Sequence, residues 1–353
     1  MPHSIPLIRA AAITPIRRWV EERGEDVGPF LARADLSWVP ADDPALPVPL
    51  RSVVRLLVEI SRAAGPDTPH RIVNGRGGFE IGLIGRAAFR GPTVRDGFAR
   101  IARMMPAHCT HEIFTVALSG DGLHIRDGWA YDLGDDEALY LVQQYVASLI
   151  DMICSVAHPE APRAERVEMV PHPEAGLNHL RPWLGDRLQP APLRALDFLV
   201  GSDVAAQRFP KGAQERAREA NGETGRRIAS GASLADQVSA LVAVMLPRTT
   251  PHLDRVAAAA GISGRTLRRA LRQNGTSFSD VVERTRAQIA VDRVRNDTDV
   301  SLGSIAADLG YANQATLSRA VRRWTGQTPR SLRSGLKSRI EPGKPVSETR
   351  LSK

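Results

Sequence analysis

Cysteine and long apolar runs are both scarce in this chain. Its 353 residues include only Cys109 and Cys154, which cannot build a disulfide framework and fit a reducing compartment. No stretch approaches the roughly 20 consecutive apolar residues of a membrane span. Pro6 and Arg9 interrupt the apolar N-terminal residues, so no signal peptide is expected. We therefore expect a cytoplasmic protein without a membrane segment.

Recognisable motifs of catalysis and of cofactor binding are also missing. We find no nucleophile elbow, no paired-carboxylate motif and no triad that sequence alone can assemble. Residues 74–82 are rich in glycine, but their spacing fits neither the dinucleotide fingerprint nor the P-loop. We interpret them as a close-packed turn. No catalytic residue and no cofactor is predicted.

One short segment concentrates potential metal ligands. His108, Cys109 and His111 stand within four residues, as a metal or redox sensor could use them. No second cluster supplies a fourth ligand, and the segment leads into an apolar run typical of a strand. We predict a simple loop here and no metal site.

The positive charge is concentrated in one region. The chain has a net charge of +8, yet residues 251–340 hold 16 Lys and Arg against 7 Asp and Glu. The remaining residues carry 31 basic and 32 acidic side chains. A basic surface kept for solubility would not explain such segregation, whereas a polyanionic partner would require it.

Two passages in this basic region are near copies of each other. Residues 253–271 and 302–321 align at an offset of 49, with a one-residue slip halfway. In each copy, apolar residues at helical spacing lead to a glycine (Gly261 and Gly310) that can end a helix. A second helix follows, with its own apolar stripe and with arginines on the opposite face. Residues 278–295 form one plausible helix between the copies. The layout is that of two helix-turn-helix units, whose second helices can lie in the major groove of DNA.

The second copy resembles the signature of AraC-type transcription regulators. An Ile-Ala helix at Ile305 leads through Gly310-Tyr311 to an arginine-bearing helix and ends in Thr325-Gly-Gln-Thr-Pro329. The resemblance covers about the last third of the chain. One departure is Leu317 and Val321, which stand where the family usually has aromatic residues. The resemblance implies a sequence-specific, double-stranded DNA-binding regulator.

Candidate DNA-contacting residues lie on the polar faces of both second helices. Ser263 is a plausible N-cap of the first one. Arginine can bond bidentately to guanine or reach phosphate, and Asn or Gln can pair with adenine. The family alignment implies base reading by Arg265, Arg268 and Arg269, and the matching positions in the second copy are Asn313, Gln314, Thr316 and Arg319. We interpret Arg322 and Arg323 as phosphate contacts. The full set is Arg265, Thr266, Arg268, Arg269, Arg272, Asn313, Gln314, Thr316, Arg319, Arg322 and Arg323.

The residues before this region predict a mixed α+β domain. Helical patterns cover residues 10–23, 48–64, 93–105 and 137–156, and residues 112–118 and 122–128 form a hairpin signal. Further strands are expected at 167–171 and 194–200. This order resembles the arabinose-binding-type sensor domain of one branch of the AraC family. Members with that sensor are associated with varied or unknown effectors, so the resemblance names no ligand.

These patterns predict four segments and one main function. An α+β effector-sensing and dimerisation domain at 1–207 precedes a linker at 208–232, an all-α DNA-binding domain with tandem helix-turn-helix units at 233–337 and a disordered tail at 338–353. We expect a cytoplasmic, nucleoid-bound regulator of the AraC type, a homodimer controlled by a small effector, able to contact RNA polymerase and by family prior an activator. The alternatives are a DNA-binding module fused to an enzymatic or redox- or metal-sensing domain, and a nucleoid-type binder without an effector.

Overall fold

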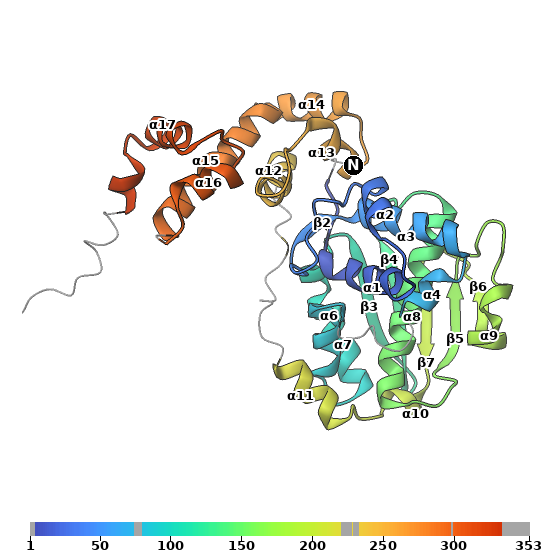
Figure 1. The fold of residues 1–353 in the computed structure, drawn as a ribbon. Helices are drawn as coiled ribbons and strands as arrows, with labels where there is room; N and C mark the ends of the chain where they lie inside the picture. The colour runs from blue at the N-terminus through green and yellow to red at the C-terminus, as the bar shows by residue number, and fades with distance from the viewer. Residues whose placement is uncertain (1–3, 74–79, 220–227, 229–232, 298, 334–353) are drawn as a thin grey trace, which may run out of the picture.

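A mixed α/β part and a wholly helical part make up the molecule (Figure 1). The computed structural model describes residues 4–73, 80–219, 228, 233–297 and 299–333. The predicted fold class, α+β followed by an all-α region with two helix-turn-helix units, is confirmed. The start of the glycine-rich segment (74–79), part of the predicted linker (220–227 and 229–232) and the predicted tail (338–353) lie outside the described residues.

A five-stranded sheet forms the centre of the N-terminal part. Its strand order is β3-β4-β7-β5-β6, and all neighbours are antiparallel except β5 and β6. The strands are β3 (Glu112–Ser119), β4 (Gly122–Trp129), β5 (Ala164–Met169), β6 (Leu188–Pro190) and β7 (Leu196–Val200). The predicted hairpin is β3 and β4, whose pairing runs from Glu112 opposite Trp129 to Ser119 opposite Gly122.

A second, two-stranded sheet and a set of helices surround this centre. The small sheet pairs β1 (Leu7–Arg9) with β2 (Pro47–Pro49) in antiparallel fashion. The helices are η1 (Ala10–Ile13), α1 (Thr14–Glu22), α2 (Gly28–Arg33), α3 (Leu50–Ala64), α4 (Thr68–Val73), α6 (Leu83–Phe89), α7 (Val94–His108), α8 (Asp136–Ala157), η2 (Asn178–Leu180), α9 (Arg181–Leu184), η3 (Gly185–Arg187), α10 (Ser202–Ala205) and α11 (Lys211–Glu219). The short elements β1, β2, β6, α4 and α6 were not predicted, because three to seven residues are too few to show a period.

Helix α8 is long and apolar enough, by length and composition alone, to cross a membrane, which differs from the expectation that no such stretch exists. It is instead a core helix: 67% of its apolar stretch is buried inside the protein. Two of its buried polar residues are bonded to other segments of the protein. Gln143 Oε1 accepts from the Val170 amide at 2.7 Å, and Asp151 pairs with Arg163 at 2.8 Å.

Besides a helical segment at residues 329–333, the described residues of the C-terminal part form six helices. They are α12 (Leu234–Met245), α13 (Leu253–Ala259), α14 (Gly264–Gln273), α15 (Phe278–Asn296), α16 (Leu302–Asp308) and α17 (Gln314–Thr325). Two separate apolar clusters form here, one around α12 to α14 and one around α16 and α17. Helix α15 contributes Val281 to the first cluster and Ala290 and Val294 to the second, so it joins the two halves.

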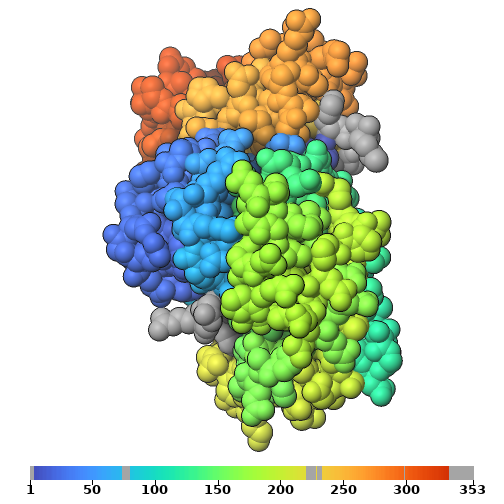
Figure 2. Space-filling model, turned by 90° about the vertical axis from the view of Figure 1, so that its right-hand side faces the viewer, coloured from blue at the N-terminus to red at the C-terminus, as the bar shows by residue number. Residues whose placement is uncertain are grey.

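The first C-terminal cluster also contains residues from the other end of the chain. Ile5 and Leu7 pack with Val238 and Leu241 of α12, while Ile8, the next residue of β1, belongs to the N-terminal core. The alternation of side chains along a strand produces this division. In the space-filling view the orange helices of the first unit rest directly on the N-terminal part (Figure 2).

Candidate nucleic-acid interface

The first helix-turn-helix unit is α13, a tight turn and α14. Gly261 adopts a left-handed φ of 69° after α13, as predicted, and the Ile262 amide bonds back to the Ala257 carbonyl at 3.0 Å. Ser263 then caps α14, because its side chain accepts from the Thr266 amide at 3.2 Å. Leu267 on α14 is fully buried, so the helix is anchored by one face.

The second unit repeats this construction with α16 and α17. Gly310 has a φ of 72°, and the Tyr311 amide bonds to the Ala306 carbonyl at 2.8 Å. Leu317 and Val321 are fully buried in their cluster although they are smaller than the aromatic residues expected there. The predicted departure from the family pattern therefore leaves a closed core.

The candidate residues on α14 lie together on its outer face. Arg265, Arg268, Arg269 and Arg272 are exposed, and Thr266 is half-buried beside the cap. These five side chains line one shallow concave surface. None of the four arginines has an ion-pair partner within the described ranges, so their guanidinium groups remain available for an external acceptor.

The start of α17 uses two of its candidate residues for its own structure. Asn313 is the N-cap, and its Oδ1 accepts from the Thr316 amide at 2.9 Å and from the Thr316 hydroxyl at 3.0 Å. Arg319 in turn donates to the Thr316 hydroxyl at 3.3 Å. Gln314 is exposed beside them. The side-chain oxygen Oδ1 of Asn313 is thus occupied, and only the side-chain nitrogen Nδ2 is free to donate outward.

The two arginines near the end of α17 differ from each other. Arg322 is exposed and has no ion-pair partner in the described part of the chain. Arg323 forms an ion pair with Glu283 of α15 and lies over the ring of Trp324. A phosphate at Arg323 would therefore compete with Glu283, which sequence spacing alone could not reveal.

Several contacts join the first unit to the N-terminal part. Arg255 Nε lies 2.9 Å from Asp35 Oδ1, and Arg248 Nη2 lies 3.1 Å from Asp43 Oδ2. Arg51 of α3 bonds to the Tyr131 hydroxyl directly beneath Gly261, where an added Cβ would come within 2.6 Å of Arg51 Nε. The contacts of Arg255 and Gly261 lie in the first unit, and that of Arg248 lies in the connection from α12 to α13. The α/β part therefore holds this half of the helical part over several residues.

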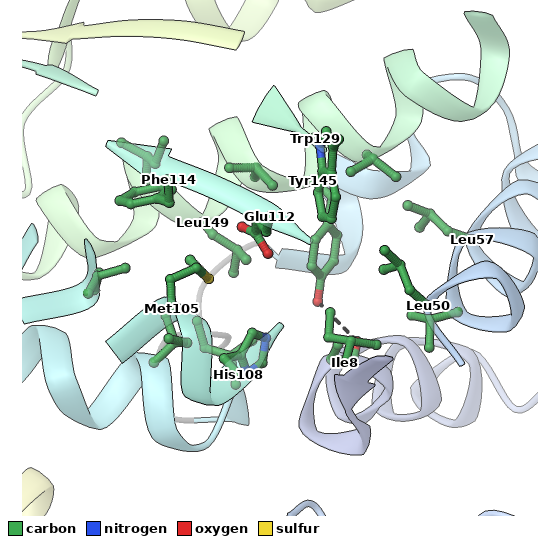
Figure 3. A pocket seen from close by; sticks show the side chains of 18 of the residues that line it. Ile8, Leu50, Leu57, Met105, His108, Glu112, Phe114, Trp129, Tyr145 and Leu149 are labelled. Atoms are coloured by element: carbon green, nitrogen blue, oxygen red, sulfur yellow. Dashed lines mark hydrogen bonds between the residues drawn. The ribbon is translucent and has the colours of Figure 1, made fainter. Parts of the chain in front are cut away.

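An apolar pocket lies inside the α/β part and was not found from the sequence (Figure 3). It is bounded by β1, α3, α7, α8 and the paired strands β3 and β4. Most of its lining is aliphatic, and its polar members are His108, Glu112, Trp129 and Tyr145. These residues come from segments far apart in the chain, so no local motif could indicate the pocket.

The segment with potential metal ligands is a three-residue connection between α7 and β3. His108 is buried at the end of α7 and lines the pocket, whereas His111 is hydrogen-bonded to Ser4 at 2.9 Å and to Thr110 at 2.6 Å. Within the described ranges no group of three His, Cys, Asp or Glu side chains could hold a metal ion. Both cysteines are buried, and burial raises the pKa of each thiol.

Two sequence models of known families match this chain. The arabinose-binding domain of AraC transcription regulators, N-terminal, matches residues 24–191, and a helix-turn-helix domain matches residues 256–335. The chain is 28% identical over 347 residues to the HTH-type transcriptional regulator VirS of Mycobacterium tuberculosis, covering 93% of this chain and 96% of that protein. It is 34% identical over 87 residues to the ornithine utilization regulator of Pseudomonas aeruginosa, which covers 25% of each chain.

A solved structure also resembles this one at low similarity. The transcriptional regulator CdpR from Pseudomonas aeruginosa aligns at a TM-score of 0.42 and 16% identity, covering 91% of this chain and 96% of that one. The assignment depends on the two sequence matches, which occur in the order sensor domain and then helix-turn-helix domain. The chain belongs to the AraC-type family of helix-turn-helix transcriptional regulators.

Proposed function

We propose that the two helix-turn-helix units bind successive major grooves on one face of DNA, about one helical turn apart. The observation that carries this proposal is the pairing of two matched units on the single helix α15. Each unit buries one face of its second helix and presents arginines on the other. A continuous helix between the units supports a fixed spacing of the two half-sites.

The proposed contacts divide by the partners the residues already have. Arg265, Arg268 and Arg269 are exposed without ion pairs among the described residues, which suits bidentate bonds to guanine. Arg319 is positioned through Thr316, so we propose that it reads a base as well.

The other candidates have supporting tasks in this proposal. Gln314 reads a base beside Arg319, and Thr266 and Arg272 extend the surface of α14. Arg322 binds phosphate, and so does Arg323 once it leaves Glu283. Asn313 and Thr316 act chiefly by shaping the start of α17.

We further propose that a small effector in the α/β part controls DNA binding. Two elements that line the apolar pocket, β1 and α3, contact the first unit through their opposite faces. On β1, Ile8 lines the pocket while Leu7 packs among the helices of the first unit. On α3, Leu50 and Val53 line the pocket while Arg51 lies beneath Gly261. An effector that shifts either wall would change how the first unit is held.

Homodimerisation, cellular location and target response form a second group of proposals. Strand β3 is an edge of the five-stranded sheet and exposes Ile113 (51%) and Leu118 (68%), which supports pairing with a second copy. In this proposal the dimer acts on the nucleoid in the cytoplasm, and the effector changes half-site engagement or contact with RNA polymerase, with activation as the outcome.

We propose a sensing domain that extends through α11, whose Ala213 and Ala217 are buried in the N-terminal core.

We propose that the protein is not an enzyme. The alternative of a catalytic or redox-sensing N-terminal part requires a reactive thiolate, and the burial of Cys109 and Cys154 with raised thiol pKa values speaks against one. Titration of the two thiols with a disulfide reagent tests this point. Rapid modification at neutral pH would revive the alternative.

Genome-wide binding of the purified protein to fragmented DNA from its own source tests the main proposal. The experiment is done at roughly physiological salt, because phosphate contacts make affinity salt-dependent. We expect a few sharp sites with paired half-sites about one turn apart. Equal binding to every fragment, with and without extracts of small molecules, would contradict a sequence-specific regulator and favour a nucleoid-type binder.

A further inference from the structure

Four side chains of the otherwise apolar pocket carry polar groups, and three of them belong to α7 and the β3–β4 hairpin. His108 ends α7, Glu112 opens β3, and Trp129 pairs with Glu112 across the hairpin. In Figure 3 the carboxylate of Glu112 points into the space between His108 and Tyr145. The other lining residues are mostly aliphatic and come from β1, η1, α1, α3, α6, α7 and α8. The pocket is thus an apolar cavity with a polar site in its wall, formed by His108, Glu112 and Trp129.

The charged side chain among the lining residues is acidic, and the buried Arg9 outside the lining lies close enough to His108 to act on it. The lining includes the Glu112 carboxyl group and no lysine or arginine. Asp127 lies behind it, two residues along β4 from Trp129, and is completely buried. An anionic ligand would bury its charge beside two carboxyl groups with no cation in the lining, which costs several kcal/mol in a protein interior. A cationic head would be neutralised there.

The Nδ1 atom of His108 is buried without a hydrogen-bond partner. Asp127, by contrast, interacts with Glu112 and Trp129. His108 is only 7% exposed, and its side chain lines the pocket. Buried polar atoms are nearly always hydrogen-bonded in folded proteins, so the unpaired His108 Nδ1 at the cavity wall indicates a missing partner. A neutral imidazole offers one acceptor nitrogen, and the carboxylates offer more.

The protonation states agree with this picture. Burial, assisted by the charge of Arg9, lowers the pKa of His108 to about 4, so its ring is neutral near pH 7. Burial raises the pKa of Glu112 to about 7, and the pKa of Asp127 is raised well above its usual value by burial and by Glu112. The carboxyl pair therefore shares protons near neutrality, and a cation would draw Glu112 into its charged form.

The size of the cavity limits the ligand. The space open to the centres of water molecules is about 100 Å³. At 10–15 Å³ for each water this holds roughly seven to ten non-hydrogen atoms. A sugar of that size would place most of its hydroxyl groups against aliphatic side chains, where they would lose their hydrogen bonds to water. The arabinose in the description of the matched family is therefore a poor fit.

We propose that this pocket binds a small apolar amine, with its protonated nitrogen donating to Glu112 and to His108 and its hydrocarbon body among the aliphatic residues. The aromatic rings of Phe114, Trp129 and Tyr145 also line the pocket and offer π-faces to the cation. This inference deepens the proposed effector control and depends on it for its regulatory meaning. The binding itself is independent of any DNA readout.

Calorimetric titration of the full-length protein tests the ligand class with a matched set of probes. Heptylamine, heptanol, heptanoate and arabinose are compared at pH 7.5. We expect heptylamine to bind at least roughly tenfold tighter than heptanoate and more tightly than heptanol, with no binding of arabinose. Tighter binding of heptanoate or arabinose, equal binding of amine and alcohol, or no amine binding at millimolar concentration would each overturn the proposal.

Two isosteric variants locate the site. Glu112→Gln should weaken heptylamine binding at least roughly tenfold and leave heptanol binding within twofold of the native value. Glu137→Gln, on the surface of α8 where Glu137 pairs with Arg62, should change neither. Circular dichroism checks that both variants fold. A third variant, Val53→Phe, fills part of the aliphatic lining and should weaken the binding of amine and alcohol alike. Retention of full amine affinity in Glu112→Gln would place the amine elsewhere.

DNA binding is measured separately, so that the two proposals can fail independently. Amine binding that leaves affinity for a genomic site unchanged would preserve the ligand assignment and remove the regulatory role. Specific DNA binding by a protein that takes up no amine would preserve the regulator and remove the ligand assignment.

Discussion

Arg255 of α13 donates from its Nε to Oδ1 of Asp35 at 2.9 Å, which connects the first helix-turn-helix unit to the turn after α2. Both side chains are about one-third exposed, so we expect a coupling energy of no more than about 1 kcal/mol. A double-mutant cycle in urea unfolding, with Arg255→Ala and Asp35→Asn, measures it. Asparagine suits position 35 because Asp35 has a φ of 58°. Asp43 is not a partner of Arg255, so the stability losses of Arg255→Ala and Asp43→Asn should be additive. A coupling energy of the same size between these two residues would refute a specific pair of Arg255 and Asp35.

The two turn glycines offer a matched comparison. Gly261→Ala and Gly310→Ala both place a Cβ on a left-handed backbone, at a cost of about 1 kcal/mol each. At Gly261 the Cβ would also meet Arg51 Nε at 2.6 Å and Tyr131 Oη at 2.8 Å, whereas at Gly310 the nearest atom is 4.0 Å away. We expect Gly261→Ala to lose more stability in thermal unfolding. Equal losses would mean that Arg51 moves aside freely.

Asn313 is predicted to act as a helix cap more than as a base reader. Asn313→Ala should lower the free energy of unfolding by about 0.5–2 kcal/mol, because the Thr316 amide loses its acceptor. Asn313→Ser keeps an N-cap oxygen, so stability and DNA affinity should both stay near the native values. If Asn313→Ser folds normally but loses specific binding, as measured by fluorescence anisotropy, the amide reads a base.

Arg319 is predicted to read a base. Arg319→Ala should weaken binding to a genomic site by about 1–3 kcal/mol and binding to random DNA much less. Arg218→Ala, on α11 outside both units, removes the same charge and serves as the control. An equal loss on both DNAs would reassign Arg319 to the phosphate backbone.

Glu112 should make stability depend on pH. The pKa of Glu112 is about 7 in the folded state, against an ordinary value of 4.5. The folded state therefore keeps the proton to higher pH than the unfolded state does. As pH rises from about 4.5 to 7, Glu112 lowers the free energy of unfolding. Glu112→Gln removes this loss, which is on the order of 3 kcal/mol at full extent. The melting temperature of the variant relative to the native protein should rise between pH 5 and pH 7.5. A difference that is constant with pH would show that Glu112 titrates normally.

The helix-turn-helix units could be predicted from the sequence because their signals are local. Glycine at the left-handed turn, a polar residue that can cap the second helix and an apolar stripe recur within twenty residues in each copy. The structure places Gly261, Ser263 and Leu267 as expected. The hairpin β3–β4 and the long helix α8 were predictable for the same reason. The residue roles on DNA stay predictions.

The pocket and the contacts between the two parts could not be predicted, since they join distant segments. Glu112 and His108 belong to different elements from Val53 and Tyr145, and only the packing of α3, α7 and α8 brings them together. The ion pair of Arg323 with Glu283 likewise joins residues 40 positions apart. Periodicity predicts which face of a helix is buried, but it does not identify the segment against which that face packs.

The division of β1 between two cores has a practical consequence for dissecting this regulator. Ile5 and Leu7 complete the apolar cluster of α12 to α14, and the Ile5 amide donates to Gln237 Oε1 at 2.7 Å. A fragment cut to begin at Ser233 would leave these two side chains behind and open its own core to water, losing about 1.5–3 kcal/mol for each. Purification of the helical half alone would therefore yield a weakened module, and its affinity for DNA would understate that of the intact chain.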